Sequence, residues 1–79
     1  MDKKTFAKLL VDGWDGGNFV ARHQTGRFTG GALSGRTVAN EESKGHRVPG
    51  RVKVGKTIAY PVESFAAWIA DRMLKQAEA

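Results

Sequence analysis

The sequence predicts a small α+β domain in which a β-hairpin leads directly into an amphipathic helix. Residues 51–60 alternate between apolar and polar side chains on both sides of Gly55-Lys56, which is typical of a hairpin with a tight turn. Pro61 then fixes φ near the helical value, and the apolar spacing changes to three and four residues. Shorter helical patterns precede the hairpin, so we expect three to four short helices and one hairpin.

The last helix is expected over residues 61–76, where apolar side chains recur at helical spacing. Glu63 in its first turn and Arg72 near its end suit the helix dipole. Phe65 and Trp68 are interpreted as core residues rather than as a platform for stacked bases. This segment is the strongest helix signal in the chain.

Two shorter helices are expected nearer the N-terminus. The first covers residues 2–11, with Asp2 as N-cap and Gly13 as the residue that stops it. The second covers residues 19–25 and is capped by Asn18. A glycine-rich connection follows, which disfavours a long regular helix there.

A further helix is expected over residues 34–43, with Ser34 as its N-cap. Its polar side carries Arg36, Thr37 and Asn40. Arginine suits guanine or phosphate, asparagine suits adenine, and threonine suits phosphate or the thymine methyl group. The free N–H groups of a helix N-terminus also attract phosphate. This helix is therefore a candidate for contact with a nucleic acid.

Positive charge is concentrated in the middle of the chain. The formal net charge is +5, and residues 18–60 contain eight basic and two acidic residues, whereas the flanks contain five basic and six acidic ones. A basic centre between near-neutral ends indicates a polyanionic partner. The competing interpretation is a basic surface that only keeps the protein soluble.

Length and composition exclude several other classes of protein. The 79 residues form one domain at most, in which residues 1–14 are a helical extension and 77–79 a fraying tail. The chain has no cysteine, which excludes a disulfide framework and a thiolate metal site, and its two histidines are far apart. No apolar run approaches the roughly 20 residues of a membrane span. We expect neither a metal nor a cofactor.

One phosphate-binding motif is rejected. Residues 50–57 satisfy the pattern G-x-x-x-x-G-K-[ST] of a P-loop. A P-loop needs a buried strand before it and a helix that begins at its Lys-Thr end. Here a loop precedes Gly50, and the helix is expected four residues after Thr57. No other catalytic arrangement is evident, so we do not expect an enzyme.

The order of these elements resembles that of a known family. In that family a Ser-capped helix precedes a hairpin that ends in an aromatic residue, and the next helix has an acidic residue, a hydrophobic one and a Trp-Leu pair. Those places are occupied here by Tyr60, Pro61, Glu63, Phe65, Trp68 and Ile69. The pattern resembles small helix-turn-helix proteins of the excisionase and AlpA type, within the MerR-like winged-helix group. Residues 29–40 are similar to the turn and recognition helix of phage-encoded members.

The resemblance implies a winged helix-turn-helix domain that binds double-stranded DNA. The recognition helix, residues 34–43, would enter the major groove, and the wing, residues 51–57, would lie on the backbone or minor groove. The expected DNA-binding residues are Arg22, Arg27, Ser34, Arg36, Thr37, Asn40, Lys44, Arg47, Arg51, Lys53, Lys56 and Thr57.

The leading functional hypothesis is a transcriptional regulator of the phage or mobile-element type. An excisionase-type factor that bends DNA is one alternative, and a basic module that binds an acidic partner protein is another. We expect a homodimer or a cooperative array on DNA, with a recombinase or RNA polymerase as a further partner. The expected location is the cytoplasm, in association with a bacterial nucleoid.

Overall fold

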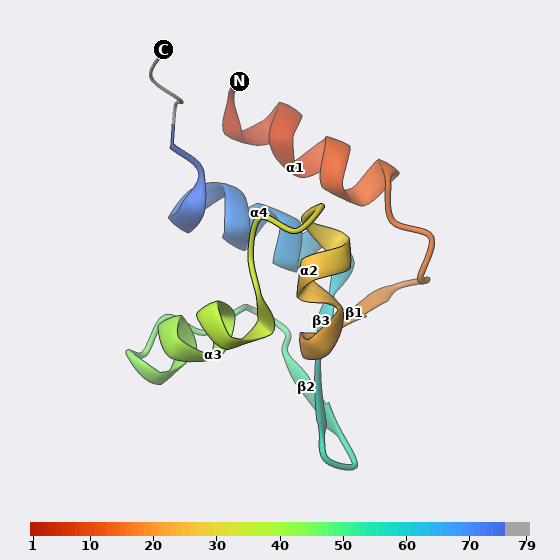
Figure 1. The fold of residues 1–79 in the computed structure, drawn as a ribbon, viewed down its shortest axis with the longest axis vertical. Helices are drawn as coiled ribbons and strands as arrows, with labels where there is room; N and C mark the ends of the chain where they lie inside the picture. Colours follow the sequence, from red (N-terminus) through yellow and green to blue (C-terminus); the bar gives the residue numbers. More distant parts are fainter. Residues whose placement is uncertain (76–79) are drawn as a thin grey trace.

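The computed structural model describes residues 1–75 and confirms a small α+β fold (Figure 1). In Figure 1, α1 lies alongside α4 at one end, and α3 and the β2–β3 hairpin form the other. Within residues 1–75, no helix is long and apolar enough to cross a membrane. The elements are α1 Lys3–Asp12, β1 Phe19–Ala21, the 3-10 turn η1 Arg22–Gln24, α2 Thr25–Phe28, α3 Gly35–Ser43, β2 Val52–Val54, β3 Thr57–Pro61 and α4 Val62–Met73.

The predicted β-hairpin is confirmed. Val54 of β2 pairs with Thr57 of β3, which leaves Gly55 and Lys56 as a two-residue loop. Gly55 has a φ of 62° and Lys56 does not have a positive φ, as in a type II′ turn with glycine at its first central position. Because Thr57 begins a strand, the helix that a P-loop requires does not begin there.

The register of the hairpin separates its apolar residues onto two faces. Val52 pairs with Ala59, so it lies on the opposite face of the sheet from Tyr60. Tyr60 is fully buried, whereas Val54 is 68% exposed. The two-residue loop fixes this register, and a slip of one residue would exchange the faces.

A third strand replaces part of a predicted helix. The helix expected over residues 19–25 is wrong, because the segment forms β1, η1 and the first residue of α2. Val20 of β1 pairs with Tyr60 of β3, and both are completely buried. Asn18 does not cap a helix; its carbonyl accepts a hydrogen bond of 3.0 Å from the N–H of Val62. A seven-residue helix is marginal by itself, and pairing with β3 gives this segment backbone hydrogen bonds and buries Val20.

The core is built around the ring of Phe65 on α4. The centroid of this ring lies 4.5 Å from that of Tyr60, 5.5 Å from that of Phe28 and 6.1 Å from that of Trp68. Trp68 is 7% exposed, and its Nε1 donates a 3.2 Å hydrogen bond to the carbonyl of His46. The prediction that Phe65 and Trp68 are core residues is confirmed. Through them α4 supports both the sheet and the loop after α3.

The predicted last helix is present but shorter at both ends. Pro61 is the last residue of β3, where it pairs with Phe19, and α4 begins after it. Its ψ of 133° is extended, so the helix cannot begin at this residue. Leu74 is also extended, with a ψ of 123°, and ends α4 after Met73. Gln76 and the tail predicted to fray lie outside the described residues.

The N-terminal helix is confirmed with its predicted cap. The carboxylate of Asp2 accepts a 2.7 Å hydrogen bond from the N–H of Thr5. Gly13 ends α1, but its φ of −82° is not the left-handed conformation that favours glycine. An exposed ion pair of 3.1 Å between Lys3 and Asp71 joins α1 to α4.

Candidate nucleic-acid interface

The N-terminus of α3 is fixed by two local features. The hydroxyl of Ser34 accepts a 3.2 Å hydrogen bond from the N–H of Thr37, which confirms the predicted N-cap. Gly35 lies against η1 so closely that a Cβ atom there would be 2.5 Å from the carbonyl oxygen of Arg22. Val38, on the inner side of α3, is completely buried. These contacts leave Arg36 and its exposed neighbours on the outer side of α3.

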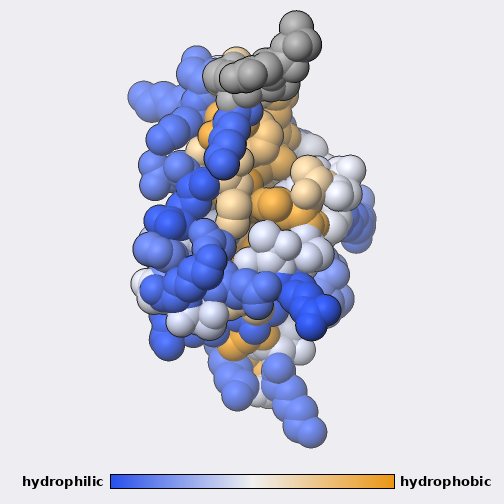
Figure 2. All heavy atoms as spheres, turned by 60° about the vertical axis from the view of Figure 1, so that its left-hand side comes forward, coloured by the Kyte–Doolittle hydropathy of each residue, from blue (hydrophilic) through white to orange (hydrophobic). Residues whose placement is uncertain are grey.

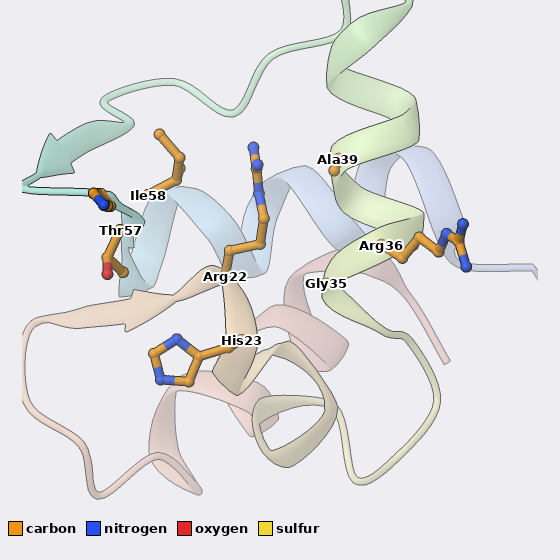
Figure 3. A pocket seen from close by; sticks show the side chains of 8 residues that line it. Arg22, His23, Gly35, Arg36, Ala39, Thr57 and Ile58 are labelled. Carbon is orange, nitrogen blue, oxygen red and sulfur yellow. The ribbon is translucent and has the colours of Figure 1, made fainter.

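A cleft of about 440 Å³ separates α3 from the hairpin (Figure 3). In Figure 3, Arg22 stands between α3 and the hairpin, whereas Arg36 extends from the other side of α3. None of the lining residues is acidic. Within residues 1–75, no group of three His, Cys, Asp or Glu side chains is arranged to hold a metal. The cleft is lined by Arg22, His23, Gly35, Arg36, Ala39, Lys56, Thr57 and Ile58.

One buried carboxylate connects α3 to the rest of the domain. Glu42 is 5% exposed, and its Oε1 accepts hydrogen bonds of 2.7 Å from both the hydroxyl of Tyr60 and Nη2 of Arg22. Its Oε2 accepts a 3.1 Å hydrogen bond from the N–H of Val48 and lies 3.2 Å from Nε of Arg51. These five residues, the Glu42 cluster, therefore join α3 to η1, to β3 and to the segment that precedes β2.

The Glu42 cluster holds its members in defined protonation states. Burial opposes the charge on Glu42, but hydrogen bonds from Tyr60, Val48 and Arg22 together outweigh it, and the pKa of Glu42 lies below its ordinary value. Burial and the hydrogen bond to Glu42 raise the pKa of Tyr60 to about 12. At neutral pH the cluster therefore consists of a carboxylate, a neutral phenol and two guanidinium groups.

Two predicted DNA-binding cations form ion pairs with acids away from the cleft. Arg27 forms an ion pair with Asp15, and its guanidinium lies 5.2 Å from the centre of the Trp14 ring. Lys44 lies 3.3 Å from a carboxylate oxygen of Glu41. Neither cation lines the cleft. Both contribute to the overall electrostatic field of the protein.

Four other predicted cations have no ion pair with any acid in residues 1–75. They come from α3, from the loop after it and from the hairpin. Long hydrophilic side chains project from the tip of the hairpin at the bottom of Figure 2. These four cations, the free cations, are Arg36, Arg47, Lys53 and Lys56.

The uncharged predicted residues are exposed on α3 and at the start of β3. Thr37 and Asn40 are exposed on α3, together with the capping residue Ser34. The hydroxyl of Ser34 lies 3.2 Å from that of Thr37, so these two share a hydrogen bond. Thr57 lies across the cleft at the start of β3. Exposed hydrogen-bonding groups are therefore present both on α3 and on the hairpin.

Sequence reasoning does not identify Glu42 as buried and places it only late in a helix. The signal that identifies it is spacing: Glu42 follows the buried Val38 by four residues, which puts both on the inner side of α3. Val48 is also missed; it is 1% exposed although it lies in a loop. Its N–H contributes to holding Glu42.

Comparison of the chain with protein-family models, with curated proteins and with solved structures finds no match. The family resemblance of the motifs remains a prediction. A function is therefore inferred from the positions and contacts of the described residues.

Proposed function

We propose that this protein binds double-stranded DNA as a small winged helix-turn-helix regulator of the phage or mobile-element type. The observation that carries the proposal is the distribution of the free cations over α3, the loop after it and the hairpin. Two of them, Arg36 and Lys56, line a cleft whose lining residues include no acid. Cations that have no acid partner in residues 1–75 attract the phosphates of a nucleic acid.

In the proposed complex, α3 is the recognition helix and the hairpin is the wing. Arg36, Thr37 and Asn40 are exposed on α3, and their side chains suit base edges in the major groove, which is wide enough for a helix. Lys53 and Lys56 of the hairpin contact the adjacent backbone. The Glu42 cluster supports this division, because it holds the hairpin at a fixed distance from α3 before DNA binds.

A domain of this size covers a short DNA site. We therefore expect two or more copies on adjacent sites, either as a homodimer or as a cooperative array. Selection of bound sequences from a random DNA pool measures this directly. Repeated or palindromic sites support several copies, and a single short site contradicts this expectation.

Gel shifts on the selected DNA test the proposed base contacts of α3 and the proposed backbone contacts of the hairpin. Arg36→Ala is expected to relax sequence preference, with a loss of about 1–3 kcal/mol on the preferred site. Lys53→Ala is expected to weaken all sequences about equally and to lower the salt slope by about 1. Lys4→Ala is the matched control, because Lys4 is an exposed cation on α1. An affinity that does not fall with salt would contradict the proposal.

Binding of an acidic partner protein is a second candidate, favoured by exposed valines beside the hairpin cations. Val52 is 39% exposed and Val54 is 68% exposed, on either side of Lys53. A partner could pack against the valines while its acids pair with Lys56 at the tip of the hairpin. Pull-down after nuclease treatment, with Val54→Ser as a variant, distinguishes the candidates. A partner retained by the wild type and lost with Val54→Ser, without any DNA binding, favours this second function.

A further inference from the structure

Three arginines from two segments, η1 and the loop between α3 and β2, meet at a second hollow near the cleft. It has a volume of about 200 Å³ and lies where η1, the end of α3 and the segment before β2 come together. Arg22, Arg47 and Arg51 line it together with Glu42. These arginines are spread over 30 positions of the sequence, so only the fold brings them together.

The charge in this hollow is not balanced. Oε1 of Glu42 lies 2.7 Å from Nη2 of Arg22, and Oε2 lies 3.2 Å from Nε of Arg51. One carboxylate is therefore the counter-ion of two guanidinium groups. Arg47 has no ion pair with an acid in residues 1–75, and the neighbouring Glu41 does not line the hollow. Three positive charges and one negative charge therefore leave a net charge of +2 in a small volume.

Arg22 and Arg51 are held in a way that leaves some of their donors free. Nε of Arg51 is buried against Glu42, whereas the two terminal amino groups of Arg51 are not buried and have no hydrogen-bond partner in the described residues. Arg22 uses Nε for the hydroxyl of Tyr60, at 2.9 Å, and Nη2 for Glu42. Paired amino groups of a guanidinium match two oxygens of a phosphate, and a side chain held in place loses less entropy on binding.

We propose that Arg22, Arg47 and Arg51 form a binding site for one phosphate group, and that Glu42 is the positioning residue that orients two of them. A phosphodiester placed there, with its single negative charge, lowers the net charge of the hollow from +2 to +1 without displacing Glu42. The assignment of this group to a phosphodiester of the DNA backbone rests on the proposed function. Recognition of phosphate by the three arginines does not depend on that assignment.

Titration with inorganic pyrophosphate, followed by NMR of the arginine Nε–H signals, tests the site without DNA. We expect the signals of Arg22, Arg47 and Arg51 to move together, while those of Arg27 and Arg72 stay unchanged. Chloride at equal ionic strength is the control. Arg47→Ala is expected to weaken binding about 10-fold, the order of one charge-assisted contact. If all arginine signals shift alike, the anion is only screening charge and the site is refuted.

Arg47 is the residue to vary, because it is exposed and has no ion pair with an acid in residues 1–75. Arg47→Lys keeps the charge but removes the paired amino groups. An intermediate affinity for pyrophosphate, below that of the wild type and above that of Arg47→Ala, supports recognition by the guanidinium. Equal affinities for the lysine variant and the wild type would overturn it.

A scan of the selected DNA with single neutral methylphosphonate linkages tests the source of the phosphate. One linkage is expected to reduce wild-type affinity about 10-fold and to have little further effect on Arg47→Ala, because the same contact is removed twice. Lys56→Ala is the comparison, and it should couple to a different linkage. If Arg47→Ala weakens every modified DNA by the same factor, the phosphate is not in this site.

The two experiments fail in different ways. Tight DNA binding without selective arginine shifts and without a coupled linkage refutes the arginine site and leaves the proposed function intact. Selective shifts with pyrophosphate, combined with no affinity for any DNA, support the site and refute the DNA-binding function.

Discussion

The base and the tip of the β2–β3 hairpin are both positively charged, but they are built differently. At the base, Arg51 and the buried Tyr60 are both held by Glu42. At the tip, Lys56 has no ion pair in residues 1–75, and Val54 is 68% exposed. The base is therefore part of the folded core, and the tip is a surface available to a ligand.

This difference shows that a charge in the sequence does not reveal its role. Arg51 and Lys53 are two residues apart, and both belong to the basic middle of the chain. The side chain of Arg51 is 26% exposed and lies against a buried carboxylate, whereas Lys53 is exposed on the hairpin. We therefore expect changes to the Glu42 contacts at the base to alter stability, and changes at the tip to alter binding alone.

The largest effect is expected from Glu42→Gln, which removes the charge at the base of the hairpin. Arg22 and Arg51 then lose their counter-ion, and losing one partner of a buried pair lowers the free energy of unfolding by about 3–5 kcal/mol. Urea unfolding followed by circular dichroism measures the change. Glu41→Gln is the matched control and should change stability by less than about 1 kcal/mol. Equal losses in the two variants would show that Glu42 has no special position.

The second effect is a loss of stability at high pH. Tyr60 has a pKa of about 12 in the folded protein and an ordinary value near 10 when unfolded, so folding binds its proton more tightly. The resulting stabilisation, roughly 3 kcal/mol, is complete below pH 10 and is lost as pH rises to 12. Tyr60 is the single tyrosine of the chain, so its absorbance as tyrosinate reports this group alone.

The control for this pH effect is Tyr60→Phe, which has no phenol to ionise. Between pH 10 and 12 its stability should fall less steeply than that of the wild type. A tyrosinate midpoint near 10 in the folded wild type would contradict the contact between Tyr60 and Glu42.

A smaller effect is expected where α3 meets η1. In Gly35→Ala the new Cβ would lie 2.5 Å from the carbonyl oxygen of Arg22, so α3 must shift, and we expect a loss of about 1–3 kcal/mol. Gly26→Ala is the control, because its Cβ would lie 3.7 Å from the carbonyl oxygen of Leu33, at ordinary van der Waals distance. Thermal unfolding of both variants measures the difference. A Gly35→Ala protein as stable as the control would mean that α3 is not fixed by this contact.

The smallest effect on stability is expected at the tip. Lys56→Ala removes an exposed cation without an ion pair in residues 1–75, so the free energy of unfolding should change by no more than about 0.5 kcal/mol. DNA affinity should fall, and more so at low salt. Parallel unfolding and gel-shift measurements separate the two quantities. If Lys56→Ala loses stability but keeps its DNA affinity, the tip contributes to folding rather than to binding, and the prediction is wrong.

The elements that are predictable from the sequence have strong local signals. Gly55-Lys56 between alternating segments predicts the hairpin, and Ser34 predicts the start of α3. The spacing around Phe65 predicts α4. In each case neighbours within a few positions determine the structure, so one segment is sufficient to identify it.

The prediction fails where distant segments meet. Residues 19–25 resemble a short helix when taken alone, but they begin with β1 because this segment pairs with β3. That partner lies about 40 positions away, so a local pattern does not reveal it. Among the predicted DNA-binding residues, the sequence does not distinguish Arg22 and Arg51, held by Glu42, from the free Lys53 and Lys56. Ion pairing depends on spatial neighbours, which local patterns do not report.

The sequence by itself determined the hairpin, the capped helix α3, the core helix α4 and the concentration of positive charge between them. Only the tertiary structure decided that β1 completes the sheet and that Glu42 is buried on the inner side of α3, paired with two arginines. The physical reason is range: turns, caps and helical spacing act over a few residues. Burial of a charge is instead decided by groups that the fold brings together, here from η1, α3 and the hairpin.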